Sequence, residues 1–367
     1  MRLRFYRHLL ATIRAVRYKK INRARLLFGL CIACCLLFYI LFFVILADGT
    51  IIDYQYLGAV DESVLKNRVD FHEVMIDRVC SKTTARCYNI FDRKLSKEGA
   101  VEVVERQLFV EGFAEDSDTA VRLIAPRGEL FDDSDTRIWQ IDHFDIRSQY
   151  VAGMLVAPFL VSALSTDSSD VGKTVLEIGL GGGSFDMFLH KLKPKVNITA
   201  IELDSVVVET AKKWFGVVEE ENHRVIVQDG LEYLKEASKR GKKSDVIALD
   251  ACDEAIRSPC PAKVFRDVEV IERLKNALTP TGCLIVNVLS EDADETPTSA
   301  QKIANLFYSV FPTCIRMKMV KETNVILLCM PYAISNVRQQ ITFYNSRLKT
   351  VTSYLKLDNI FDKISIA

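Results

Sequence analysis

The sequence predicts an α/β protein: a Rossmann-like, doubly wound sheet of seven strands, preceded by a small β-rich segment and an N-terminal membrane helix. Two observations predict the sheet. The apolar run Val175–Ile178 leads directly into a glycine-rich loop, 179–183, and a second strand, 199–204, ends in acidic residues. Further strand-length apolar runs alternate with segments of period near 3.6, which is typical of helices that cover a parallel sheet.

The remaining elements follow in order along the chain. The expected strands are 225–227, 246–249, 284–288, 314–319 and 325–330. A helix should begin after Asp204 and end at Gly216, and two more should cover about 268–278 and the surroundings of 303–310. Because only residues 320–324 separate the last two strands, a parallel crossover is excluded and an antiparallel hairpin is expected.

The glycine loop and the acidic strand end predict a nucleoside site. The pattern is E-x-G-x-G-x-G, from Glu177 through Gly179 and Gly181 to Gly183, where missing side chains let a ligand approach the backbone. Glu202 then stands at the end of the neighbouring strand and is expected to accept both ribose hydroxyls, with Leu203 beside it. Ser184 replaces the last glycine of the dinucleotide fingerprint, so the expected cofactor is S-adenosylmethionine. An ordinary strand–helix turn is the alternative.

Ligands of open α/β sheets lie at the carboxyl ends of the strands, which directs attention to two further acidic stretches. Asp229, followed by Gly230, is placed to accept from an adenine amino group. Asp250 and Asp253 face the expected position of the sulfonium methyl, so either is a candidate catalytic residue that holds an incoming amine. Capping of the next helices is the alternative role for Asp229 and Asp253. Tyr150, on a helix expected over 148–164, is a candidate substrate contact or a core residue.

Several short motifs carry a family resemblance. They are Gly179-Leu-Gly-Gly-Gly-Ser184, Ala200-Ile-Glu-Leu-Asp204, Trp214-Phe-Gly216, Asp229-Gly-Leu-Glu-Tyr233, Asp245-Val-Ile247, Ser258-Pro-Cys-Pro261 and Leu278-Thr-Pro-Thr-Gly282. Over residues 140–330 the chain resembles the C-terminal domain of the dual lysine and N-terminal methyltransferases of elongation factor 1-alpha, and more distantly spermidine synthase. The resemblance implies a Class I S-adenosylmethionine-dependent methyltransferase fold. It also implies a protein or peptide substrate with a free amine, either an N-terminal α-amine or lysine.

Two departures from the polyamine enzymes favour methyl transfer over aminopropyl transfer. The glycine-loop aspartate with which those enzymes hold the cofactor's ammonium corresponds to Gly182, and their Tyr-x-Glu-Met stretch corresponds to 151–154. Loss of these carboxylates makes room for the carboxylate of intact S-adenosylmethionine. Asp250 and Asp253 match the polyamine enzymes' catalytic-loop aspartates, so a spermidine synthase-like aminopropyltransferase remains an alternative. A cofactor-binding pseudoenzyme scaffold is another.

The N-terminus predicts a membrane anchor. Residues 26–47 contain no charge, and 22 residues at about 1.5 Å each span roughly 33 Å, enough for a bilayer core. Nine Lys and Arg residues and no acid precede them, so residues 1–25 should be a cytosolic tail and the protein a type II, single-pass endomembrane protein. A mitochondrial presequence, and hence a mitochondrial membrane, is the alternative. The expected later parts are a β-rich segment 48–145, a methyltransferase domain 146–335 and a C-terminal helical extension 336–367.

Composition excludes some function classes. The whole chain has 48 basic and 48 acidic residues, so the nine basic residues of the leader leave a net charge near −9 on the rest, which argues against nucleic-acid binding. His143, His190 and His223 have no Cys/His partners at ligand spacing, and no metal is expected.

Cys80 and Cys87 should bridge if the domain is lumenal, whereas strand residues Cys283, Cys314 and Cys329 are expected to be free thiols. Asn197-Ile-Thr199 is a glycosylation sequon.

Overall fold

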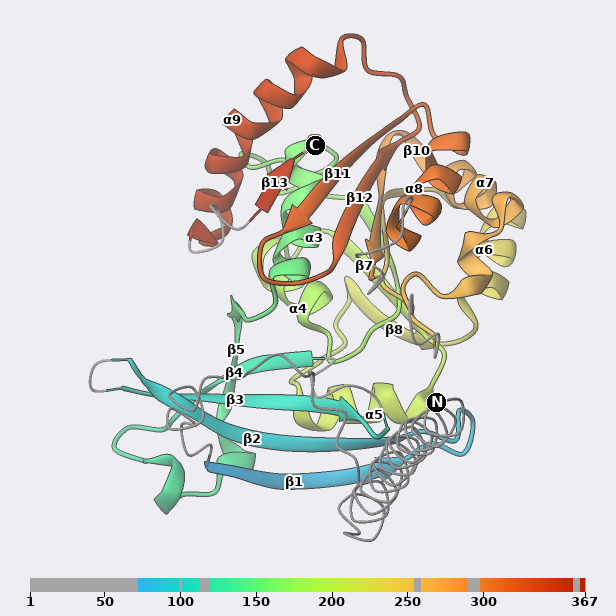
Figure 1. Cartoon of the computed structure of the whole chain (residues 1–367). Coiled ribbons are helices and arrows are strands. Elements are labelled where there is room, and N and C mark those ends of the chain that lie inside the picture. Colours follow the sequence, from blue (N-terminus) through green and yellow to red (C-terminus); the bar gives the residue numbers. More distant parts are fainter. Residues whose placement is uncertain are drawn as a thin grey trace, which may run out of the picture. The chain divides into compact units, whose positions relative to one another are not determined.

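Two β-sheets follow one another along the chain in the computed structural model (Figure 1). The structure describes residues 72–98, 101–112, 119–253, 259–289, 298–358 and 364–366, all within one unit, Val69–Ala367. The expected basic tail 1–25 and membrane helix 26–47 lie outside these residues. None of the helices described has the length and hydrophobicity of a transmembrane span.

The first sheet confirms the expected β-rich segment. It is antiparallel and consists of β1 (His72–Cys80), β2 (Cys87–Glu98), β3 (Val101–Val110), β4 (Thr119–Ile124) and β5 (Gln140–Ile146), in that order. Buried Arg106 pairs with buried Asp92 at 2.7 Å and also donates to the Trp214 carbonyl oxygen at 3.0 Å. This fully partnered charge therefore joins the first sheet to the helix that ends at Trp214, since a buried charge is tolerated only when it is paired.

The second sheet is the expected doubly wound one. Its strands are β6 (Thr174–Ile178), β7 (Asn197–Glu202), β8 (His223–Val227), β9 (Ser244–Leu249), β10 (Leu278–Val288), β11 (Thr313–Met319), β12 (Val325–Met330) and β13 (Ile364–Ile366). They lie in the order β13-β11-β12-β10-β9-β6-β7-β8. The five strands from β8 to β10 are parallel, and β11 and β12 form the predicted antiparallel hairpin. Strand β13 adds an eighth strand at the β11 edge.

Helices cover both faces of the second sheet. They are α3 (Gln149–Leu160), α4 (Ser184–Leu192), α5 (Ser205–Trp214), α6 (Gly230–Lys239), α7 (Val268–Asn276), α8 (Ser299–Val310) and α9 (Val337–Leu355). Short 3-10 helices occupy Phe131–Asp133, Thr136–Ile138 and Lys263–Arg266. Successive strand residues point to opposite faces, so Val246 and Ala248 pack with α3, α4 and α9 while Ile247 and Leu249 pack with α6, α7 and α8.

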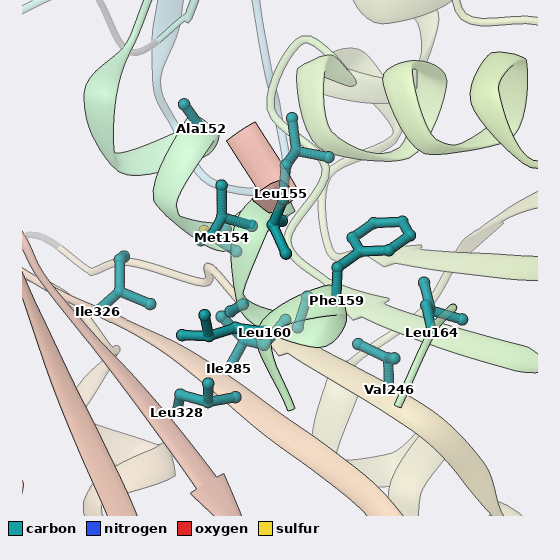
Figure 2. Packing of buried hydrophobic residues seen from close by; sticks show 14 of the residues in the cluster. Ala152, Met154, Leu155, Phe159, Leu160, Leu164, Val246, Ile285, Ile326 and Leu328 are labelled. Carbon is teal, nitrogen blue, oxygen red and sulfur yellow. The ribbon is translucent and has the colours of Figure 1, made fainter. Parts of the chain in front are cut away.

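The helix α3 forms the centre of the larger core (Figure 2). Met154, Leu155 and Leu160 are almost fully buried and lie with Ile285 and Leu328 of the neighbouring strands. The helix ends at Leu160 rather than at the expected Leu164, because Ser162 takes a left-handed conformation with φ of 61°. Because α3 is buried around nearly its whole circumference, nearly all of its residues are apolar.

Cysteine pairing differs in part from the sequence-based expectation. Cys80 and Cys87, which were expected to bridge only in a lumenal domain, form a disulfide, and Cys283 is free and buried. The expectation of free thiols at Cys314 and Cys329 is wrong, because the β11–β12 register places them directly opposite each other and they form a disulfide. A third disulfide, Cys252–Cys260, follows β9.

Candidate functional site

The candidate site lies where the strand order of the second sheet reverses. From β6 the chain moves outward to β7 and β8, and then returns to β9 on the other side of β6. Three backbone hydrogen bonds of 2.9 Å hold the carboxyl ends of these strands together: Gly179 N to Ile201 O, Asp250 N to Ile178 O, and Gln228 N to Glu202 O. The loops after these strands therefore meet at the switch point, the position at which open α/β sheets bind ligands.

Gly179 lies against the loop that carries Asp250. Its φ is 93°, and a Cβ there would stand 2.7 Å from the Asp250 carbonyl oxygen. Both the left-handed conformation and the close backbone contact require glycine. The glycine thus has a packing role that brings the β6 and β9 loops together.

The other glycines of the loop also make room for protein neighbours. A Cβ on Gly183 would lie 2.3 Å from Val217 Cγ2, and one on Gly181 would lie 3.2 Å from Thr119 Oγ1. At Gly182 a Cβ would meet Thr119 Cγ2 at 2.3 Å, while the Gly182 N–H donates to Thr119 Oγ1 at 3.0 Å. Thr119, the first residue of β4, was not predicted from the sequence as part of the site, since only the fold brings it to this loop.

Glu202 is held at the end of β7 by backbone donors. Its Oε2 accepts from Leu180 N and its Oε1 accepts from Asp204 N, both at 3.0 Å. Burial raises the pKa of Glu202 above the usual value, against the effect of these N–H donors. Leu203 is 55% exposed beside it, which is unusual for a large apolar side chain and leaves an apolar surface next to the carboxylate.

Glu177 is a buried acid whose side chain is one hydrogen-bond partner short. It is 2% exposed, and its Oε2 has no partner among the described residues. Burial raises the pKa of Glu177 well above the usual value, and the nearby charges of Asp186, Asp250 and Glu202 raise it further. Because buried polar atoms are nearly always satisfied, this oxygen is a candidate contact for a bound group.

Asp229 has the capping role that was one of its two predicted roles. Its Oδ1 accepts from Leu231 N at 2.7 Å and from Glu232 N at 3.3 Å, at the start of α6. Gly230, the first residue of α6, lies against β6, since a Cβ there would stand 2.7 Å from Ile178 Cγ2. Asp229 is exposed at the same sheet edge as Glu202, where it can also meet a ligand.

The two candidate catalytic acids lie on the segment after β9. Asp250 Oδ1 accepts from Asn287 Nδ2 at 2.7 Å. Asp253 Oδ2 accepts from Lys263 N at 2.6 Å, at the start of a 3-10 helix, so it too has the predicted alternative of a capping role. The Cys252–Cys260 disulfide and the bond from Ala262 N to Ala251 O close this segment.

Tyr150 lies at the N-terminus of α3 and packs, half-buried, against the larger core. Its backbone N–H donates to Glu322 Oε2 at 2.7 Å, and Gln149 N donates to Glu322 Oε1 at the same distance. Sequence reasoning missed Glu322, which belongs to the hairpin turn between β11 and β12.

Two buried asparagines next to Asp250 were also missed. Asn287 interrupts the apolar strand run of β10, and Asn324 precedes β12. A polar residue inside an otherwise apolar strand was the signal that could have revealed Asn287.

No cluster of metal-ligating side chains occurs in the part of the chain that the structure describes.

Comparison with known proteins identifies the family. The spermine/spermidine synthase domain matches residues 161–345, half of the chain. The chain belongs to the spermine/spermidine synthase domain family. The expected resemblance to the eEF1A lysine and N-terminal methyltransferases is also confirmed.

Three relatives define the range of similarity. The eEF1A lysine and N-terminal methyltransferase homolog of Drosophila melanogaster is 26% identical over 246 residues, 64% of this chain and 35% of the relative. Polyamine aminopropyltransferase of Vibrio vulnificus is 31% identical over 164 residues, 44% of this chain and 52% of the relative. A probable spermidine synthase from Corynebacterium glutamicum shares the fold, with a TM-score of 0.53, 13% identity and coverage of 77% and 94%. The chain thus spans only about a third to a half of the two curated relatives' length.

Proposed function

We propose that this chain is a membrane-anchored S-adenosylmethionine-dependent methyltransferase that modifies a protein amine, either an N-terminal α-amine or lysine. The observation that carries the choice of cofactor is the packing at Gly182. In the resemblance drawn from the sequence, the aminopropyltransferases bind the cofactor's ammonium with an aspartate here. In this chain the Cγ2 of Thr119 occupies the space that such a side chain would enter.

The residues at the switch point fit an adenosyl cofactor. Glu202 would hold the ribose hydroxyls, Asp229 the adenine amino group, and Leu203 would offer an apolar surface to the base. The unpartnered buried oxygen of Glu177 is the structural feature that favours a bound group. When bound, the cofactor supplies an activated methyl group on a sulfonium centre, which is a good leaving group.

The chain's own contribution is to bind and orient the amine. Asp250 and Glu202 both lie close to Glu177, and this cluster of acids at the end of the sheet favours a cationic group. Transfer needs the neutral amine, and an α-amine of pKa about 8 is neutral far more often near pH 7 than a lysine of pKa about 10.4. Asp250 or Asp253 would orient that amine and stabilise the cation formed when its nitrogen takes the methyl group.

The disulfides support the proposed location of the domain. In the part of the chain that the structure describes, six cysteines form three disulfides and Cys283 is the free one. Disulfides persist in oxidising compartments and are rare in the cytosol. This pairing favours a type II protein anchored in the bilayer by residues 26–47, with its catalytic domain in the lumen of the endomembrane system. A mitochondrial membrane is the second location.

Aminopropyl transfer is the second candidate activity, favoured by the family match itself and by the acidic pair after β9. Calorimetry of the full chain in detergent micelles tests the choice. We expect S-adenosylmethionine to bind more tightly than its decarboxylated form, and the reverse preference would support aminopropyl transfer. If the cofactor binds but labelled cofactor transfers no methyl group to a membrane and lumenal proteome, the chain is a binding scaffold.

Glu202→Gln provides the accompanying test of the cofactor site. Loss of a charged acceptor should weaken S-adenosylmethionine binding roughly tenfold to a hundredfold, because hydrogen bonds to charged groups contribute about 1.5–3 kcal/mol. Glu232→Gln, at an exposed glutamate of α6, is the matched control and should bind like the wild type. Equal binding by all three proteins would refute the assignment of Glu202.

A further inference from the structure

Two buried asparagines connect Asp250 to the hairpin turn between β11 and β12. Asn287 is 2% exposed and Asn324 is 9% exposed. Asn287 stands in the centre of a sheet whose neighbouring strand residues are apolar. Burial of an amide is unfavourable unless its hydrogen bonds are made, so the burial of these two side chains must be compensated by specific hydrogen bonds.

Their hydrogen bonds run in one direction. Asn324 Nδ2 donates to Asn287 Oδ1 at 2.8 Å, and Asn287 Nδ2 donates to Asp250 Oδ1 at 2.7 Å. An ionised carboxylate can only accept, so Asp250 requires the NH2 end of Asn287. The oxygen end of Asn287 must then face Asn324, which has to present its own NH2 group. The hydrogen bonds from Asn324 to Asn287 and from Asn287 to Asp250 therefore fix the orientation of all three side chains.

The same hairpin turn also holds the helix that carries Tyr150. Glu322 accepts from the backbone N–H groups of Gln149 and Tyr150, and the N–H of Lys321 donates to Gln149 Oε1 at 3.1 Å. One short turn is thus bonded to the candidate substrate contact on one side and, through Asn287, to the candidate catalytic acid on the other.

We infer that Asn287 and Asn324 are positioning residues that orient the Asp250 carboxylate toward the incoming amine. The inference rests on the proposed transferase function for the role of Asp250. The two asparagines touch Asp250 or one another and not the reacting atoms, so they act on the rate of transfer through Asp250.

Isosteric variants test the direction of the chain of bonds. In Asn324→Asp the donor to Asn287 becomes an acceptor, so Asn287 must either flip away from Asp250 or lose its partner. The assay measures label incorporation from saturating labelled S-adenosylmethionine into a lumenal protein extract. Incorporation should fall roughly tenfold in Asn324→Asp. It should fall further in Asn287→Asp, because this variant places two carboxylates next to each other. Affinity for S-adenosylmethionine should stay within about twofold of wild type in Asn324→Asp.

Thr352→Val is the matched control. Thr352 is fully buried on α9 and its hydroxyl donates to the Leu348 carbonyl oxygen, so this variant also loses a buried hydrogen bond. It should transfer label like the wild type. If it loses as much activity as Asn324→Asp, the effect is one of stability and the inference is overturned.

An exchange of partners separates positioning from simple structural support. The double variant Asp250→Asn with Asn287→Asp restores a donor–acceptor pair, and the carboxylate now placed on β10 can still accept from Asn324. Its thermal stability should recover relative to Asn287→Asp, whereas label incorporation should remain lost because the carboxylate has moved. Recovery of both properties would mean that the pair only supports the fold.

A double-mutant cycle decides the coupling without any methyl acceptor. Asp250→Ala and Asn324→Ala each change the unfolding equilibrium constant by some factor. In the double variant the change should differ from the product of these two factors by roughly twofold or more. The deviation should vanish when Asn287 is replaced by Leu. Multiplicative effects would overturn the inference even in an active enzyme, while absence of methyl transfer by wild-type protein would instead refute the proposed function.

Discussion

At Gly179 the backbone conformation and the neighbouring chain both require the absence of a side chain. The variant Gly179→Ala meets a positive φ of 93° and a carbonyl oxygen at 2.7 Å. The conformation alone disfavours alanine by about 1–2 kcal/mol, and the contact adds the displacement of the Asp250 loop. We expect denaturant unfolding to show a loss of more than about 3 kcal/mol, together with loss of S-adenosylmethionine binding.

Gly172→Ala is the control for this prediction. Gly172 also has a positive φ, of 81°, but nothing lies within 4 Å of the position its Cβ would take. It should therefore show the conformational penalty alone and bind the cofactor normally. Similar losses in both variants would mean that the approach to Asp250 is less tight than the structure indicates.

The segment between β9 and η3 (Lys263–Arg266) is an element held at both ends. Cys252 and Cys260 join its two sides, Ala262 N donates to Ala251 O, and Leu289 N donates to Cys260 O, which ties it to the end of β10. Since Asp250 and Asp253 flank Cys252, the disulfide restricts the positions that both carboxylates can take. An element that must align a nucleophile benefits from such restriction.

Removal of this disulfide should affect transfer more than stability explains. Cys252→Ser with Cys260→Ser opens a loop of sequence separation 8, and Cys80→Ser with Cys87→Ser opens one of separation 7. Loops this similar should give similar stability losses, of about 2–3 kcal/mol. Methyl transfer measured below both melting temperatures should fall roughly tenfold in the first variant only. An equal fall in both would assign the disulfide a purely structural role.

The elements differ in how far the sequence could predict them. Strands β6 to β12 carry apolar runs of strand length, so local pattern was enough to place them. The helix expected over about 268–278 ends at Asn276, and residues 279–282 form an irregularity within β10, because Leu278 pairs with Ser244 before the main register begins at Cys283. Thr119 beside Gly182, and Asn324 beside Asn287, are contacts between distant segments that no local pattern encodes.

At the scale of the whole molecule, charge and cysteine pairing bear on location. The sequence outside the basic leader carries a net charge near −9, and an acidic excess of this size suits a domain that binds cationic amines. The three disulfides among the described residues favour an oxidising compartment. A lumenal domain would act on the amines of proteins that share this compartment.

Glycosylation in cells gives the last prediction. The sequon asparagine Asn197 is exposed at the amino end of β7, opposite the end that carries Glu202. In the full chain expressed in cells, we expect a mobility shift that peptide N-glycosidase removes and that Asn197→Gln abolishes, with cofactor binding unchanged. A sequon made in the leader by Arg4→Asn with Tyr6→Thr should stay unmodified. Modification of the leader sequon instead would reverse the topology, and modification at neither site would favour the mitochondrial alternative.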